Sequence, residues 1–146
     1  MGKESLLPKR FNDKSGLVMS GILFLCIHNA GRSQMAAGFA RALSQGSVTI
    51  LSGGSEPAET VNPVAVEVMN EVDIDISQFA PQKYNDELLN SVDVVVTMGC
   101  GDTCPYIPGK RYVDWPLDDP KGRPIDDVRR IRDDIRDRVA ELLTQL

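Results

Sequence analysis

Short apolar runs and stretches of helical periodicity alternate along this chain. Residues 21–25 are continuously apolar and bounded by glycine, a pattern typical of a strand buried on both faces. Residues 33–43 are rich in helix formers and place Met35, Phe39 and Leu43 four positions apart. The beginning of the chain therefore predicts a buried strand followed by a helix with one apolar face.

The alternation continues to the C-terminus. We expect further strands at residues 48–51, 92–97 and 111–115, the last at a sheet edge, and short helices after Asn62 and over residues 85–89. Asn62 followed by Pro63 is typical of a helix start. The last helix is predicted at residues 125–143, with an apolar stripe of Val128, Ile131, Ile135, Val139 and Leu142. This order predicts an α/β fold, a three-layer sandwich around a central four-stranded parallel sheet.

The size and charge of the chain narrow the function classes. Its 146 residues fit one domain, and we predict a single catalytic domain at residues 19–146. Residues 1–18 are predicted to form a flexible N-terminal arm, which is either native or an added extension. A net charge of −5 argues against nucleic acid or an anionic membrane as a partner. Residues 17–27 are too short to span a bilayer and lack a cleavage site, so we expect a cytoplasmic protein.

The most informative segment is the loop that follows the first strand. Cys26 closes the strand, five residues separate it from Arg32, and a helix begins at Ser33. A helix N-terminus attracts anions and favours the thiolate form of a nearby cysteine, and a guanidinium binds a tetrahedral oxyanion through two N–H groups. We predict Cys26 as a nucleophile. The predicted oxyanion-binding residues are His28, Asn29, Ala30, Gly31, Arg32 and Ser33.

The sequence of this loop has three other interpretations. A core cysteine followed by a plain turn is the commonest one for an isolated cysteine. A protease-type Cys/His pair needs a histidine from elsewhere, but His28, inside the loop, is the only one in the chain. A nucleotide-binding loop needs glycine and lysine spacings that residues 26–33 lack.

A nucleophile that attacks an oxyanion needs a proton donor for the departing oxygen. Asp118 and Asp119, directly before Pro120, are the candidates, although an Asp-Pro turn has the same local sequence. Ser33 can donate a hydrogen bond to Cys26, cap the helix, or do both.

Two further cysteines follow the predicted third strand. Cys100 and Cys104 could form a thiol relay with Cys26, or they could be bystanders. Zinc is a weak alternative, because a second pair of ligands would have to come from Cys26 and His28 in the loop. We therefore expect neither a metal nor a cofactor.

Residues 22–37 resemble the anion loop of the arsenate reductases built on the low-molecular-weight protein tyrosine phosphatase fold. Matches continue at residues 62–63, 73–77, 94–97, 104–105, 115, 118–120 and 128–135, so the resemblance covers about residues 21–143. Gln34 stands where phosphatase members usually have proline, and no paired tyrosines follow Pro120. Both differences favour a reductase.

The resemblance implies a role for each candidate. Cys26 would be the nucleophile, Arg32 the arsenate ligand and Asp119 the general acid, with Cys100 and Cys104 as relay thiols reduced by thioredoxin. Ala37 stands where some members have a cation-ligating glutamate, so the resemblance does not imply a potassium site next to the loop. The alternatives are an arsenate reductase that uses a small thiol such as mycothiol, a tyrosine phosphatase, and a non-catalytic oxyanion-binding or redox-sensing module.

Overall fold

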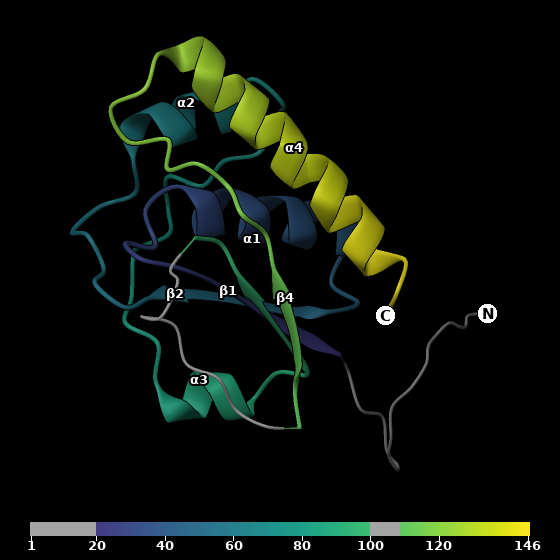
Figure 1. Cartoon of the computed structure of the whole chain (residues 1–146). Helices are drawn as coiled ribbons and strands as arrows, with labels where there is room; N and C mark the ends of the chain where they lie inside the picture. Colours follow the sequence, from purple (N-terminus) through teal and green to yellow (C-terminus); the bar gives the residue numbers. More distant parts are fainter. Residues whose placement is uncertain (1–19, 100–108) are drawn as a thin grey trace.

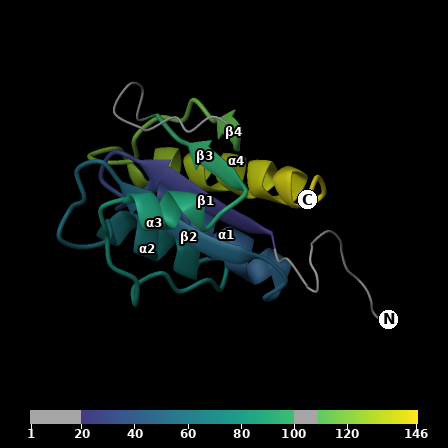
Figure 2. The same ribbon diagram turned by 90° about the horizontal axis from the view of Figure 1, so that it is seen from below.

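The computed structural model describes residues 20–99 and 109–146 and contains a four-stranded, fully parallel sheet in the order β2-β1-β3-β4. The strands are β1 (Gly21–Cys26), β2 (Thr49–Gly54), β3 (Val94–Thr97) and β4 (Arg111–Asp114). The helices are α1 (Arg32–Ser44), α2 (Pro63–Asn70), α3 (Asp86–Asn90) and α4 (Ile125–Leu143). Helices α1, α2 and α4 cover one face of the sheet and α3 covers the other (Figures 1 and 2). The predicted three-layer sandwich is confirmed.

Strand β1 lies at the centre because its residues are apolar on both faces. Ile22 and Phe24 belong to a large core with α1, α2 and α4, whereas Leu23 and Leu25 belong to a smaller core on the α3 side. All six residues of β1 are buried. The continuous apolar run thus predicts the middle of the sheet, and β4 lies at an edge as expected.

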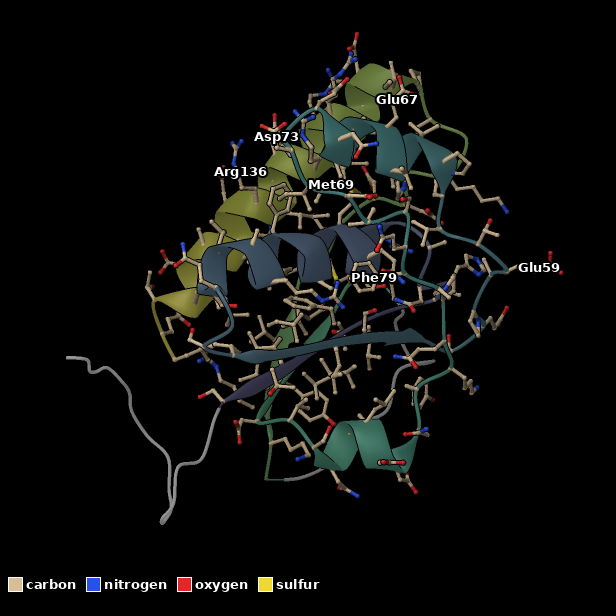
Figure 3. All side chains as sticks on the ribbon, turned by 180° about the vertical axis from the view of Figure 1, so that it is seen from behind. Glu59, Glu67, Met69, Asp73, Phe79 and Arg136 are labelled. Carbon is tan, nitrogen blue, oxygen red and sulfur yellow. The ribbon has the colours of Figure 1, made fainter. Side chains whose placement is uncertain are left out.

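Helix α1 differs from its predicted pattern at one end. Met35 and Phe39 are buried, but the side chain of Leu43 is 49% exposed, so its assignment to the buried face is wrong. The buried part of the helix ends at Ala40, and the last turn extends beyond the layer that covers it. Within the covered part, Met69 of α2 packs against Gly38 (Figure 3).

Helix α4 has the predicted bounds and is joined to α2 by ion pairs. Arg132 donates hydrogen bonds to the Val68 carbonyl and to Glu71, each at 2.8 Å, and Arg129 lies 2.7 Å from Glu71. Hydrogen bonds from Arg129, which has the larger effect, and from Arg132 lower the pKa of Glu71 from 4.5 to about 2. Other charges on α4 pair along the helix, as in Arg138 with Asp134, which fits a solvated face.

The strand order determines where a ligand can bind. The chain leaves β1 for β2 on one side, through α1, and later returns to β3 on the other side. Ligands of open α/β sheets bind beyond the carboxyl ends of the strands at such a reversal. Cys26 lies at this point. No helix within residues 20–99 and 109–146 is long and apolar enough to cross a membrane. The predicted arm at residues 1–18 lies outside the described residues.

Candidate active site

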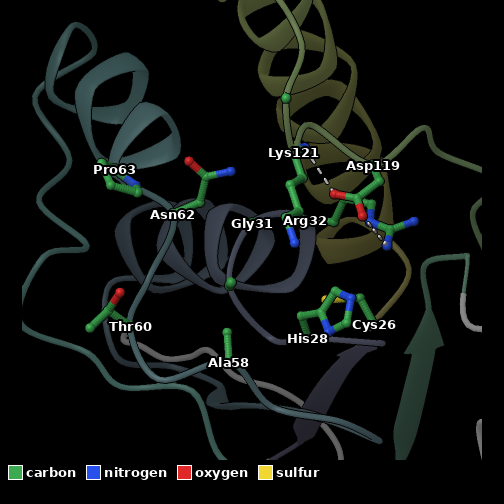
Figure 4. Close-up of a pocket in the computed structure, with 12 residues that line it drawn as sticks. Cys26, His28, Gly31, Arg32, Ala58, Thr60, Asn62, Pro63, Asp119 and Lys121 are labelled. Atoms are coloured by element: carbon green, nitrogen blue, oxygen red, sulfur yellow. Dashed lines mark hydrogen bonds and ion pairs between the residues drawn. The ribbon is translucent and has the colours of Figure 1, made fainter.

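A pocket of about 310 Å³ opens at the carboxyl end of β1 (Figure 4). Three segments line it: the loop between β1 and α1, residues 58–63 before α2, and residues 119–122 after β4. Cys26, Arg32 and Asp119 all contribute to the lining. The predicted nucleophile, anion ligand and general acid therefore meet in one cavity, although Asp119 is far from the other two in the sequence.

The orientation of the Cys26 thiol follows from a chain of hydrogen bonds behind the loop. The backbone N–H of Gln82 donates to Asn29 Oδ1 at 2.9 Å, which fixes which way the Asn29 amide points. Asn29 Nδ2 then donates to Ser33 Oγ at 2.7 Å. Because the serine oxygen accepts this bond, its own proton is available to Cys26 Sγ, 2.9 Å away. When Cys26 is a thiolate its sulfur can only accept, so Ser33 then donates to it and stabilises the negative charge.

Asn29 is the residue on which this network depends. It is fully buried and has a φ of 49°, a left-handed conformation that asparagine tolerates better than most residues. Gln34 donates to the Asn29 carbonyl at 3.1 Å, and the side chain of Gln82 donates to the Ser52 carbonyl at 2.8 Å. The side chains of Asn29 and Ser33 therefore lie behind the loop and outside the pocket lining. Ser33 makes no helix-cap hydrogen bond, so that part of its expected role is wrong.

Arg32 is held from several sides. Its side chain is 6% exposed, and Nη1 donates to the Leu117 carbonyl at 3.1 Å. Gly99, with a φ of +86°, lies so close to the guanidinium that a side chain at this position would collide with it. Arg32 therefore contacts the segments that follow β3 and β4 while it lines the pocket that begins at β1.

The two aspartates before Pro120 have different environments. Asp119 lines the pocket, lies 3.8 Å from Arg32 and accepts a hydrogen bond from the backbone N–H of Lys121. The side chain of Asp118 is 73% exposed and lies 3.7 Å from Arg123, away from the pocket. Between these two carboxylates, only Asp119 is placed to serve the pocket.

His28 lies at the rim of the pocket with one ring nitrogen engaged. Its Nδ1 is 3.0 Å from the Glu56 carbonyl, which can only accept, so Nδ1 carries the proton. In the neutral ring Nε2 is then a bare acceptor. Because the ring lines the pocket, this acceptor is available to a protonated oxygen of a bound oxyanion (Figure 4).

Residues 21–146 match the family model described as low molecular weight phosphotyrosine protein phosphatase. The chain belongs to this family. It is 38% identical over 128 residues to arsenate reductase 2 of Staphylococcus haemolyticus, with 85% of this chain and 96% of that protein covered. A solved arsenate reductase in its phosphate-binding state has 34% identity and a TM-score of 0.76, with 87% of this chain and 98% of that chain covered.

A solved thioredoxin-dependent arsenate reductase of Corynebacterium glutamicum is 38% identical, with a TM-score of 0.77. The match covers 87% of this chain and 61% of that chain, so this phosphatase-family chain spans about three fifths of its length. Each of these relatives matches 85–87% of the chain.

Sequence reasoning missed several residues of this phosphatase-family pocket. Residues 58–63 line one wall, and Lys121 and Gly122 line another. Local sequence gives no signal for the first group, because a polar loop before a helix has many uses. Lys121 could have been suspected from its position directly after Pro120. The predicted relay thiols Cys100 and Cys104 fall outside the described residues.

Proposed function

We propose that this protein is an arsenate reductase that uses Cys26 as its nucleophile. The observation that carries the proposal is the convergence of Cys26, Arg32 and Asp119 on one pocket, 93 residues apart at the extremes of the sequence (119 − 26). The relatives that are 34–38% identical to the chain and carry the name arsenate reductase support the same reaction.

The first step makes a covalent arsenic adduct. Arsenate binds against Arg32 and the backbone of residues 28–33, and its hydroxyl group donates a hydrogen bond to His28 Nε2. The Cys26 thiolate, stabilised by the Ser33 hydroxyl, attacks arsenic and forms an S–As bond. The bond from arsenic to this hydroxyl oxygen breaks, and Asp119, in its protonated form, delivers the second proton so that the oxygen departs as water.

The second step transfers the electrons. The Cys100 thiolate attacks the Cys26 sulfur, an S–S bond forms, and the electron pair of the S–As bond reduces arsenic from As(V) to As(III), which leaves as arsenite. Cys104 then attacks Cys100, which returns Cys26 to its thiolate and moves the disulfide to Cys100–Cys104.

The reductant we propose is thioredoxin, which would reduce the Cys100–Cys104 disulfide by thiol exchange. The thioredoxin-dependent relative supports this choice. Free thiols of this kind persist in a reducing compartment, so we place the protein in the cytoplasm. A phosphatase that hydrolyses phosphate esters through Cys26 and Arg32 is the second candidate, supported by the family model.

The decisive assay measures arsenite formed from arsenate with thioredoxin, thioredoxin reductase and NADPH. A parallel reaction contains mycothiol, and a third contains a phosphate ester. We expect sustained arsenite formation with thioredoxin and none from Cys26→Ser, because a serine hydroxyl is a far weaker nucleophile. Phosphate release without arsenite would identify the phosphatase. Anion binding without turnover of either compound would identify a binding module.

Two single variants test the relay. In Cys104→Ser the resolving thiol is missing, so one turnover should leave a Cys26–Cys100 disulfide that peptide mass mapping detects. In Cys100→Ser the arsenic should stay bound to Cys26, with no arsenite released. Full thioredoxin-supported activity of the Cys100→Ser/Cys104→Ser double variant would contradict the relay.

A further inference from the structure

One charged side chain of the pocket has no part in the mechanism above. Lys121 follows the Asp119–Pro120 turn and lines the pocket. Figure 4 shows its side chain running from the turn toward Gly31 and His28, with the ammonium group directed into the cavity. The remaining residues of the turn hold it there: Pro120 is buried next to Gly31, and the backbone N–H of Lys121 donates to Asp119 Oδ1 at 3.0 Å.

The charges of the pocket explain why a second cation matters. Among the lining residues, Arg32 and Lys121 are the arginine and lysine, and Asp119 is the carboxylate. The reacting form has a Cys26 thiolate and a protonated Asp119, so Arg32 alone would leave the pocket neutral before a dianion enters. The protein as a whole carries −5 and repels that dianion. With Lys121 the reacting pocket is positive by one charge.

We propose that Lys121 is a specificity-determining residue that recruits doubly charged oxyanions to Cys26. The inference deepens the proposed function and rests on it for arsenate as the ligand. The position of Lys121 on the turn that carries Asp119 brings the cation to the side of the pocket opposite residues 58–63 (Figure 4). The positive charge of Lys121 strengthens the binding of a small, doubly charged oxyanion in this pocket.

The test compares the alkylation of Cys26 by iodoacetate, an anion, and by iodoacetamide, which is neutral. Both reagents need the thiolate, so the ratio of their rate constants reports the local potential independently of thiol ionisation. The product is quantified on the tryptic peptide of residues 15–32, which separates Cys26 from the two other cysteines. Inorganic phosphate is the binding probe.

Lys121→Gln should lower the iodoacetate-to-iodoacetamide ratio about threefold to tenfold at low salt, the size expected for one partly exposed charge. Lys121→Arg keeps the charge and should retain the ratio. Lys110→Gln is the matched control, because it changes the net charge equally but lies before the amino end of β4, where Lys110 Nζ donates to the Val92 carbonyl. The effect should fade at about 1 M salt, where the Debye length is about 3 Å.

In Lys121→Gln, phosphate should also protect Cys26 from alkylation more weakly than in the wild type, by the same factor as the fall in the ratio. The KM for arsenate should rise by this factor, with kcat little changed. An unchanged ratio in Lys121→Gln, or an equal fall in Lys110→Gln, would overturn the proposal. A lower ratio in Lys121→Gln in a protein that forms no arsenite with any reductant would support the role of Lys121 and contradict the reductase. The two proposals therefore fail separately.

Discussion

Replacing Asn29 by alanine should destabilise the fold and misorient the nucleophile at once. The substitution removes the acceptor of the Gln82 backbone N–H and the donor to Ser33. A partly buried N–H without a partner costs about 1–2 kcal/mol, and the lost bond to Ser33 about 1 kcal/mol. Alanine at a φ of 49° adds about 1 kcal/mol. We expect a total loss of roughly 3–4 kcal/mol.

Two control variants separate these contributions. Asn29→Gly loses the same hydrogen bonds but accepts the left-handed backbone, so it should be about 0.5–1 kcal/mol more stable than the alanine variant. Asn85→Ala removes one comparable bond, to the Leu88 N–H at 2.8 Å, from a residue with an extended φ of −148°. Its cost should be about 1 kcal/mol, as for other helix caps.

Urea unfolding followed by tryptophan fluorescence measures these differences. Trp115 is the only tryptophan, is 6% exposed, and its ring lies 6.0 Å from that of Phe24 in the large core. Iodoacetamide labelling of Cys26 in the same samples should slow in both Asn29 variants, because Ser33 is no longer held toward the sulfur. The reasoning is refuted if the free energies of unfolding of both Asn29 variants lie within about 0.5 kcal/mol of the wild-type value, less than the loss of one typical hydrogen bond. It is also refuted if the glycine variant is the less stable of the two.

Three further predictions concern other parts of the molecule. Asp119→Asn should slow formation of the arsenic adduct about 10²–10⁴-fold in rapid-quench experiments, whereas Asp118→Asn should have little effect. Equal losses of rate in the two variants would show that Asp119 is not the general acid. Gly31→Ala places a Cβ 2.8 Å from Pro120 Cγ, so kcat should fall about 10²-fold as the Asp119 turn shifts, and wild-type kcat would contradict this contact. Glu71→Gln should reduce the free energy of unfolding above about pH 5, where the carboxyl is ionised in both states. This loss should shrink as the pH falls toward about 2, the folded-state pKa, and disappear below it. A difference independent of pH would exclude this ion pair as the cause.

The sequence predicts well what depends on local periodicity. The stripe from Val128 to Leu142 fixes one face of α4 within a single helix, and both ends of that helix are as expected. The run in β1 is apolar on both faces, so its central place in the sheet also follows from neighbouring residues. The predicted burial of Leu43 is wrong because burial depends on where the covering layer of helices ends. The periodicity within α1 holds no information about that position.

The sequence predicts the part of the candidate site whose residues lie close together in the chain. Cys26 and Arg32 share one loop, so their spacing alone indicates an anion site. The contacts of Gly99 and Leu117 with Arg32, and of Gln82 with Asn29, join segments 53 or more residues apart. Such contacts exist only after the strands are ordered in the sheet. Ser33 illustrates the consequence, because its hydroxyl bonds to Cys26 and leaves the helix end uncapped.

The position of Arg32 links ligand occupancy to the melting temperature of the protein. Its guanidinium group touches the segments after β3 and β4, so it braces three strand ends together. An oxyanion bound to the folded state alone raises its stability by about 2.7 kcal/mol at 100 times Kd. Arsenate or phosphate should therefore act as a thermal stabiliser of the sheet, and a thermal-shift titration becomes a binding assay that requires no reductant.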